Sequence, residues 1–290
     1  MSGRPLARRS RTPIPTRRAR SVRRASAGMS TARAGAALAM LVSAAAIYGV
    51  GASPAFNYTK LQIDGVVFTD KTKVESTLAA ARGENLFRLA TGPLQAELEA
   101  MPTVEHARVD VRLPGTLAVT IEEREPVLIW QVGDRRWLAD AGGDLFALAG
   151  GDLPQEAAGL PVIDDRRAGS ILLGLGSQLD AVDVDAATRL ASLKPSDVGS
   201  SAVALAVAAT DENGFVLTTK PGAWTAIFGF YTPSLRTTAL IPGQVRLLRT
   251  LLFGRESQVE RVILASDTDG TFTSRPTPTP KLSAKPSVAP

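Results

Sequence analysis

The sequence predicts an α+β protein with a single transmembrane helix, a small first domain of order β-α-α-β-β and a mixed, strand-rich second domain. Three observations lead to this prediction. No charged side chain lies between Arg33 and Lys60, a stretch about as long as a membrane-crossing helix. Apolar residues then recur at helical spacing up to Met101 and at every second position from Val109. Short strand-like runs separated by turn residues follow Pro126.

Basic charge is concentrated at the N-terminal end. The 290-residue chain holds 33 Lys and Arg against 28 Asp and Glu, a net charge of +5. Within residues 1–33 there is no acid, and the bases are Arg4, Arg8, Arg9, Arg11, Arg17, Arg18, Arg20, Arg23, Arg24 and Arg33. The remaining chain is therefore acidic. We expect residues 1–33 to be a disordered, basic cytoplasmic tail; specific DNA binding is the less favoured alternative, because no aromatic residue is interleaved for base stacking.

Residues 34–55 are predicted to be the transmembrane helix. The preceding arginines keep the N-terminus in the cytoplasm under the positive-inside rule, so the bulk of the chain should lie outside it. Arginines beside a bilayer also attract anionic membrane lipid. The alternative is a cleaved signal peptide with Ser53-Pro54-Ala55 as a loose processing site. We prefer an uncleaved anchor because the apolar run exceeds the roughly 7–15 residues of a signal core.

The first domain should begin with a strand, two helices and a hairpin. A strand is expected over residues 58–66, where Leu61 and Ile63 alternate with polar residues. A helix capped by Thr69 or Asp70 should follow and end at Gly83.

The second helix and the hairpin complete the pattern. Leu94, Leu98 and Met101 share a helical face that Pro102 ends. Alternation then places Val109, Val111 and Leu113 on one face of a strand, Pro114-Gly115 at the turn, and Leu117, Val119 and Ile121 inward on the return strand, with Ala118 outward.

Five segments of this region, in order and spacing, are similar to the signatures of one protein family. They are Leu61-Gln62-Ile63-Asp64-Gly65, Gly83-Glu84-Asn85-Leu86-Phe87, Met101-Pro102-Thr103-Val104-Glu105-His106-Ala107, Val109 through Leu117, and Glu123-Arg124-Glu125-Pro126-Val127. Residues 57–125 thereby resemble the POTRA domain of the FtsQ/DivIB family of bacterial cell-division proteins. His106 falls where that family varies, and we expect it to be a solvent-facing strand residue.

Residues 126–270 are expected to be an FtsQ-type β domain, since the segments Trp137 to Gly143 and Leu160 to Ile163 resemble its markers. Strands are predicted at 127–132, 136–139, 203–209, 215–219 and 259–265, with an aromatic run at 224–230 and helices near 183–193 and 242–253.

Two features depart from the family pattern, and the end of the chain has its own composition. Residues 232–241 are longer than the usual join between strand and helix, and Ile263 replaces an acidic residue of the closing strand. Residues 271–290 are rich in Pro, Thr and Ser and are expected to form a disordered tail.

No residue set for enzyme chemistry is predicted. The chain has no cysteine and one histidine, which disfavours disulfides, thiolate metal sites and a Ser-His-Asp triad. Glu122, Glu123 and Glu125 alternate across a strand and are interpreted as a charged hairpin end. Gly142-Gly143 and residues 174–176 are interpreted as turns. We therefore expect no catalytic, cofactor-binding or metal residues, no cofactor and no enzyme activity.

The resemblance implies a membrane-anchored, non-enzymatic divisome scaffold. Its partners would be single-span division proteins of the FtsB/DivIC and FtsL types, together with other divisome membrane proteins. It would lie in the inner (plasma) membrane, single-pass and enriched at the septum, and would link its partners to septal wall synthesis. An alternative is a POTRA-bearing chaperone or transport adaptor for exported polypeptides.

The predicted partner-binding region is the closing strand, taken as an exposed sheet edge to which a partner adds a strand. Its residues are Val259, Arg261, Val262, Ile263, Leu264, Ala265 and Ser266. Val262 and Leu264 should share one face, with Arg261 and Ile263 on the other.

Overall fold

The computed structural model describes residues 30–151 and 153–276. Residues 1–29 of the predicted basic tail and the part of the predicted C-terminal tail after residue 276 lie outside the described residues, whereas residues 31–33 of the predicted tail are helical. The chain divides into two compact units between Ser53 and Pro54, and each is described by itself.

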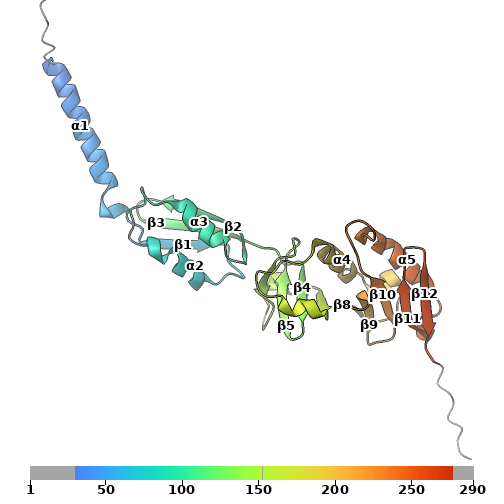
Figure 1. Cartoon of the computed structure of the whole chain (residues 1–290). Helices are drawn as coiled ribbons and strands as arrows, with labels where there is room; N and C mark the ends of the chain where they lie inside the picture. The colour runs from blue at the N-terminus through green and yellow to red at the C-terminus, as the bar shows by residue number, and fades with distance from the viewer. Residues whose placement is uncertain (1–29, 152, 277–290) are drawn as a thin grey trace, which may run out of the picture. The chain divides into compact units, whose positions relative to one another are not determined.

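Helix α1 (Thr31–Gly51) is the described element of the first unit (Figure 1). The Ser30 side chain caps it by accepting a hydrogen bond from the Arg33 N–H. Within the described residues it is the one helix long and apolar enough to cross a membrane. The predicted bounds of 34–55 were wrong at both ends, because the Ser30 cap starts the helix earlier and Pro54 follows its end closely.

The first domain has the predicted order of strand, helix, helix and hairpin. Its elements are β1 (Lys60–Asp64), α2 (Lys71–Leu78), α3 (Thr91–Glu99), β2 (Val104–Arg112) and β3 (Thr116–Glu123). The three-stranded sheet has the order β1-β3-β2, with β1 parallel and β2 antiparallel to the central strand. Figure 1 shows α2 and α3 beside this sheet.

Side-chain burial in this domain follows the predicted alternation, with one exception. Leu117, Val119 and Ile121 are buried in the core of the first domain. Ala118 is not part of this core, and it is buried in the central strand between its register partners Gln62 and Asp110. Leu113 is exposed, because it lies in the turn beyond the end of β2.

The two local predictions for the start of α2 and for His106 are confirmed. The Asp70 side chain accepts a hydrogen bond from the Thr72 N–H at 2.8 Å and so caps α2. His106 is an exposed residue of β2.

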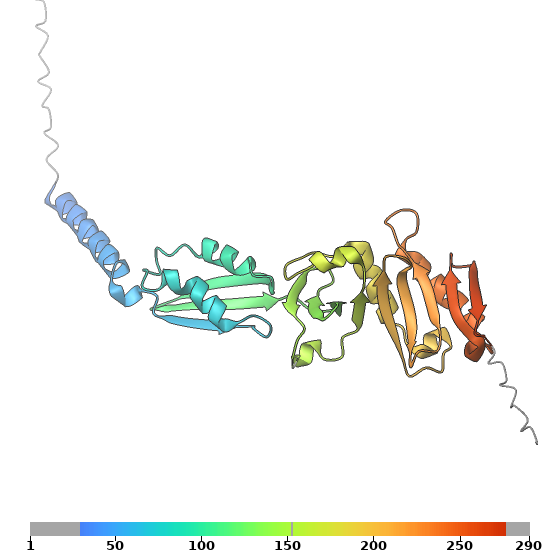
Figure 2. The same ribbon diagram turned by 60° about the horizontal axis from the view of Figure 1, so that its bottom comes forward.

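The second domain is built on a nine-stranded mixed sheet of order β12-β11-β10-β9-β8-β7-β4-β5-β6. Its elements are β4 (Leu128–Val132), β5 (Arg135–Ala139), β6 (Leu145–Leu148), β7 (Val162–Asp165), α4 (Ala181–Ala191), β8 (Ala204–Thr210), β9 (Gly214–Lys220), β10 (Thr225–Gly229), α5 (Ile241–Leu252), β11 (Val259–Leu264) and β12 (Gly270–Ser274). The pairs β4–β7, β7–β8 and β10–β11 are parallel, and the others are antiparallel. Figure 2 shows the strands β8 to β10, coloured from gold to orange, side by side.

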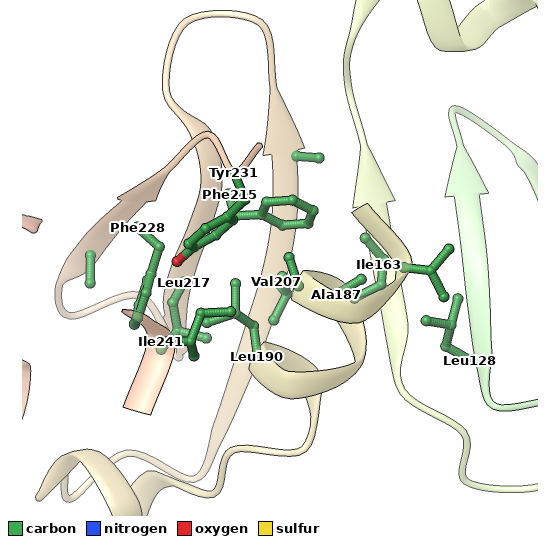
Figure 3. Packing of buried hydrophobic residues seen from close by; sticks show 14 of the residues in the cluster. Leu128, Ile163, Ala187, Leu190, Val207, Phe215, Leu217, Phe228, Tyr231 and Ile241 are labelled. Atoms are coloured by element: carbon green, nitrogen blue, oxygen red, sulfur yellow. The ribbon is translucent and has the colours of Figure 1, made fainter. Parts of the chain in front are cut away.

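The core of this domain lies between the sheet and two helices. Helix α4 contacts β7 to β9, and α5 contacts β10 to β12. Figure 3 shows Ala187 and Leu190 of α4 against Val207 and Leu217 of the sheet, and all four are buried. Val262 and Leu264 join the same core, whereas Ile263, the residue between them, is exposed. The sheet therefore has a face covered by α4 and α5 and, at its β10–β12 end, an opposite face on which no helix of residues 30–276 packs.

Glu123 and Arg124, at the end of β3, bind the loop after β1 and the second domain, respectively. The Glu123 carboxylate accepts three hydrogen bonds from the N–H groups of residues 67–69, at 2.6–2.8 Å. The Arg124 guanidinium donates to the carboxylates of Asp140 and Asp144 at 2.7 and 2.8 Å, and so links the first domain to the second. Glu123 therefore does more than the predicted charged hairpin end, because it also fixes the loop after β1.

Candidate partner-binding edge

The predicted partner-binding residues lie on β11 and in the turn that follows it. Val262 and Leu264 are buried, whereas Arg261 and Ile263 are exposed on the opposite face, as the alternation predicts. Val259 is also buried, because the register shifts between Val259 and Arg261. Ala265 and Ser266 leave the strand. The Ser266 hydroxyl accepts hydrogen bonds from the N–H groups of residues 268 and 269, which closes the turn into β12.

The premise that this strand is an exposed edge was wrong. Strand β11 pairs with β10 on one side, with Ala226 opposite Val262, and with β12 on the other, with Phe272 opposite Val262. Both rows of its backbone groups therefore face neighbouring strands, and a partner cannot add a strand to β11 while β12 is in place.

The free edge belongs to β12. It is the last strand of the sheet, and no strand of the described residues pairs with its outer side. Residues 271–274 are exposed, and the strand has no charged residue and no proline, the usual features that block strand addition. The predicted start of a disordered tail at residue 271 was therefore wrong, because β12 continues through Ser274.

The open face beside this edge carries both polar and apolar side chains. Arg261 lies opposite Thr273 in the β11–β12 register, and Ile263 lies opposite Thr271. Side chains opposite each other in an antiparallel pair share a face of the sheet. Ile263 is 44% exposed, so this face offers one apolar contact between a cation and two hydroxyls.

A polar network holds the ends of β10 and β11. Gln244 of α5 is fully buried, and its side chain donates to the carbonyls of Phe228 and Leu264 at 3.2 and 3.1 Å. The Tyr231 hydroxyl donates to the Gln244 carbonyl oxygen at 2.7 Å. Burial raises the pKa of Tyr231, so it stays a neutral donor. Arg236, from the unusually long 232–241 segment, donates to the same two carbonyls at 2.7 Å.

A second polar contact fixes the residues that lead into β11. The Glu256 carboxylate accepts hydrogen bonds from the Ser200 hydroxyl, the Ser201 N–H and hydroxyl, and the Trp224 indole. Burial raises the pKa of Glu256, but these hydrogen bonds outweigh it and lower the pKa to about 2. Glu256 is therefore ionised at neutral pH and fastens the loop before β8 to the start of β11.

One buried ionisable pair was missed by sequence reasoning. Asp165 is 1% exposed and accepts hydrogen bonds from Arg167, Ser170 and the Trp130 indole. Burial raises the pKa of Asp165, but the hydrogen bonds from Arg167 and Ser170 outweigh it and lower the pKa. Arg167 also binds Asp183 at 2.5 Å, so the pair is fully engaged in holding β7 to α4. The nearness of Asp165 and Arg167 was visible in the sequence, but the burial of the Asp165 carboxylate was not.

Among the residues that the structure describes, no group of three or more His, Asp or Glu side chains could hold a metal ion. The turns predicted at Gly142-Gly143 and at residues 174–176 are found, since Gly143 and Gly176 adopt positive φ angles of 89° and 82°.

The strand β12 was not predicted. Its signal was the alternation of Thr271 and Thr273 with Phe272 after the turn residues 266–270, which the following prolines obscured.

Comparison with known proteins places this geometry in context. Residues 56–124 match the model of the FtsQ-type POTRA domain. Curated proteins named cell division protein FtsQ are similar to the chain. The one from Chloroflexus aggregans is 27% identical over 59% of this chain and 61% of its own length. The one from Burkholderia pseudomallei is 33% identical over 44% and 50%, and the one from Rickettsia bellii is 28% identical over 33% and 36%.

The chain thus spans between about a third and three fifths of the length of these relatives. The residues that the family model matches include all the strands and helices of the β-α-α-β-β domain. Residues 56–124 of this chain are a POTRA domain of the FtsQ type.

Proposed function

We propose that this protein is a membrane-anchored, non-enzymatic cell-division scaffold that binds single-span partners through β12. The observation that carries the proposal is the open, uncharged edge of β12 in a chain with an FtsQ-type POTRA domain. The partners are division proteins of the FtsB/DivIC and FtsL types, whose extracytoplasmic segments the scaffold links to septal wall synthesis.

The proposed contact is strand addition. A partner segment in extended conformation pairs with the outer N–H and C=O groups of β12, and each net hydrogen bond contributes about 1 kcal/mol. Side chains give selectivity, because Ile263 and Arg261 lie on the open face one strand away. The predicted residues of β11 then contribute through these two side chains, and their backbone is not available.

The proposed anchor is α1. Its length and apolar composition suit a bilayer, and the arginines before it favour a cytoplasmic N-terminus. The POTRA and β domains then lie outside the cytoplasm in the plasma membrane of a dividing cell, enriched at the septum.

The strand-addition contact is tested with two adjacent prolines. Successive residues of a strand direct their N–H groups to opposite sides, so one of Thr271 and Phe272 points to β11 and the other outward. Thr271→Pro and Phe272→Pro are made separately in the full-length protein. The variant that loses an outward N–H should keep the thermal midpoint of the wild type and lose at least about tenfold in partner affinity. Equal affinity for wild type and both variants, with both folded, contradicts strand addition at β12.

The cellular role is tested by imaging and depletion. A fluorescent protein on the N-terminus of the full chain should form a midcell band in dividing native cells, and depletion should give filaments. A uniform peripheral signal with normal division would instead support the alternative, a POTRA-bearing chaperone or transport adaptor. Diffuse cytoplasmic fluorescence from a released tag would point to a cleaved signal segment.

A further inference from the structure

One end of the POTRA domain carries most of its exposed large apolar side chains. In residues 57–125, all of which the structure describes, these are Val67, Phe87 and Leu113, with exposures of 51%, 56% and 52%. Phe87 and Leu113 come from different loops. Both loops lie at the end of the sheet where β1 begins, which is also where the chain enters the domain.

The first loop is fixed to the entering chain by backbone hydrogen bonds. The Tyr58 N–H donates to the Glu84 carbonyl at 2.8 Å, and the Leu86 N–H donates to the Phe56 carbonyl at 2.9 Å. The Asn85 side chain accepts from the Phe87 N–H at 3.0 Å. These bonds hold the Phe87 ring edge-on to the Phe56 ring, with centroids 5.1 Å apart. The aromatic pair is therefore part of the folded domain.

The second loop is the β2–β3 turn. The N–H groups of Thr59 and Lys60 both donate to the Gly115 carbonyl, at 2.9 and 3.0 Å. The approach is close, because a Cβ on Gly115 would lie 2.8 Å from the Thr59 hydroxyl oxygen. Leu113 is thus presented on the same end as the aromatic pair.

The charge of this end is basic. The segments 56–60, 82–88 and 112–116 contain four bases and one acid, Glu84. The bases, all exposed, are Lys60, Arg82, Arg88 and Arg112. Exposed aromatic and aliphatic side chains ringed by Lys and Arg are typical of surfaces that lie in the headgroup region of anionic membranes.

The tether length makes this contact reachable. Phe56 follows the last residue of α1, Gly51, by five residues, which span at most about 18 Å when fully extended. We propose that this basic, apolar end, which we call the Phe56–Phe87–Leu113 surface, binds the lipid headgroups of the outer face of the membrane. The inference rests on the proposed function, since it requires α1 to span the bilayer.

The experiment uses the full-length protein in vesicles of phosphatidylcholine and phosphatidylglycerol that contain lipids spin-labelled near the carbonyl. Because the chain has no cysteine, Phe87→Cys, Leu113→Cys and Val67→Cys each give one site for a fluorophore. Val67 is the matched control. It is similarly exposed, but its N–H donates to Glu123 at the far end of β3, about 25 Å along the strand from Leu113.

We expect the spin-labelled lipid to quench the labels at 87 and 113 at least about twofold more than the label at 67, and high salt to reduce the difference. Equal quenching at the three positions overturns the lipid contact. So does the absence of quenching at 87 and 113 combined with cross-linking of these positions to another membrane protein in cells.

Flotation of the vesicles after an alkaline wash separates this inference from the proposed anchor. Protein that floats but shows equal quenching contradicts only the Phe56–Phe87–Leu113 surface. Protein that fails to float contradicts the membrane span of the proposed function, and the lipid contact with it.

Discussion

The two edges of the nine-stranded sheet are built in different ways. At the β6 edge, Leu145 and Phe146 are fully buried. A neighbouring segment covers the Leu145 backbone, since its N–H donates to the Ser177 carbonyl at 2.9 Å and its carbonyl accepts from the Gly176 N–H at 2.7 Å. At the β12 edge the outer side has no strand partner among the described residues, and Phe272 keeps 37% of its surface exposed.

This difference shows that one sheet can have a protected edge, at β6, and an edge accessible to other chains, at β12. The β6 edge is stabilised by apolar burial, which also hides its backbone from other chains. The β12 edge can pair with a strand of another protein only if no segment of this chain covers it, so burial of this kind cannot stabilise it. The strands next to it are instead held by polar side chains, namely Gln244 and Arg236 at the ends of β10 and β11 and Glu256 before the start of β11.

The largest expected effect comes from the same change at both edges. Phe146→Ala should lower the free energy of unfolding by about 3–5 kcal/mol, because it removes a fully buried ring. Phe272→Ala should cost about 1 kcal/mol or less, because the ring is partly exposed before the change. Urea unfolding of the two full-length variants measures both values. Equal costs would remove the distinction between a buried and an open edge.

Gln244 tests whether the open edge is held by polar contacts. Gln244→Leu should lower the free energy of unfolding by roughly 2–3 kcal/mol, because the buried Tyr231 hydroxyl loses its acceptor and two carbonyls lose a donor. The double variant with Tyr231→Phe should recover part of this loss, since the unpaired hydroxyl is then gone. A double variant less stable than Gln244→Leu alone would contradict this assignment.

The contrast between the edges also marks what could be predicted from sequence. The first domain was predictable because its alternating residues, such as Leu117, Val119 and Ile121, report the buried face of a strand directly. The open edge was not, because strand order depends on long-range pairing. The β11 pattern looks the same whether its neighbour is solvent or β12.

The polar supports were missed for a related reason. Gln244 and Glu256 lie in a helix and a loop where polar residues normally face solvent, and nothing in their local pattern shows that they are hydrogen-bonded to distant segments. Arg236 was flagged only as part of an unusually long join. In the structure this long segment places the Arg236 guanidinium where it donates hydrogen bonds to the carbonyls of Phe228 in β10 and Leu264 in β11.

The contribution of the Glu256 carboxylate to stability near the β12 edge should depend on pH. Its pKa is lowered from 4.5 to about 2, so its stabilisation is fully present above pH 4.5 and is lost as the pH falls towards 2. Glu256→Gln should cost about 1–2 kcal/mol at pH 7, allowing for solvent screening of a partly exposed carboxylate.

The measurement is urea unfolding of wild type and Glu256→Gln at several pH values, with the difference between them narrowing below pH 4.5. Amide hydrogen exchange at low pH adds the location, because β11 and β12 should lose protection before β6. A gap between the two proteins that stays constant from pH 7 to pH 3 would show that the Glu256 charge does not hold this edge.

The smallest effect on stability should accompany a large effect on binding. Lysines on an edge strand disfavour the addition of a further strand, so Thr271→Lys combined with Thr273→Lys should weaken partner binding by roughly tenfold or more. Both threonines are exposed, so the free energy of unfolding should change by no more than about 0.5 kcal/mol. Thr250→Lys, on the exposed side of α5, controls for added charge in the same domain. If Thr250→Lys weakened binding as much as the β12 pair, the effect would come from charge in general, and the open edge would lose its assigned role.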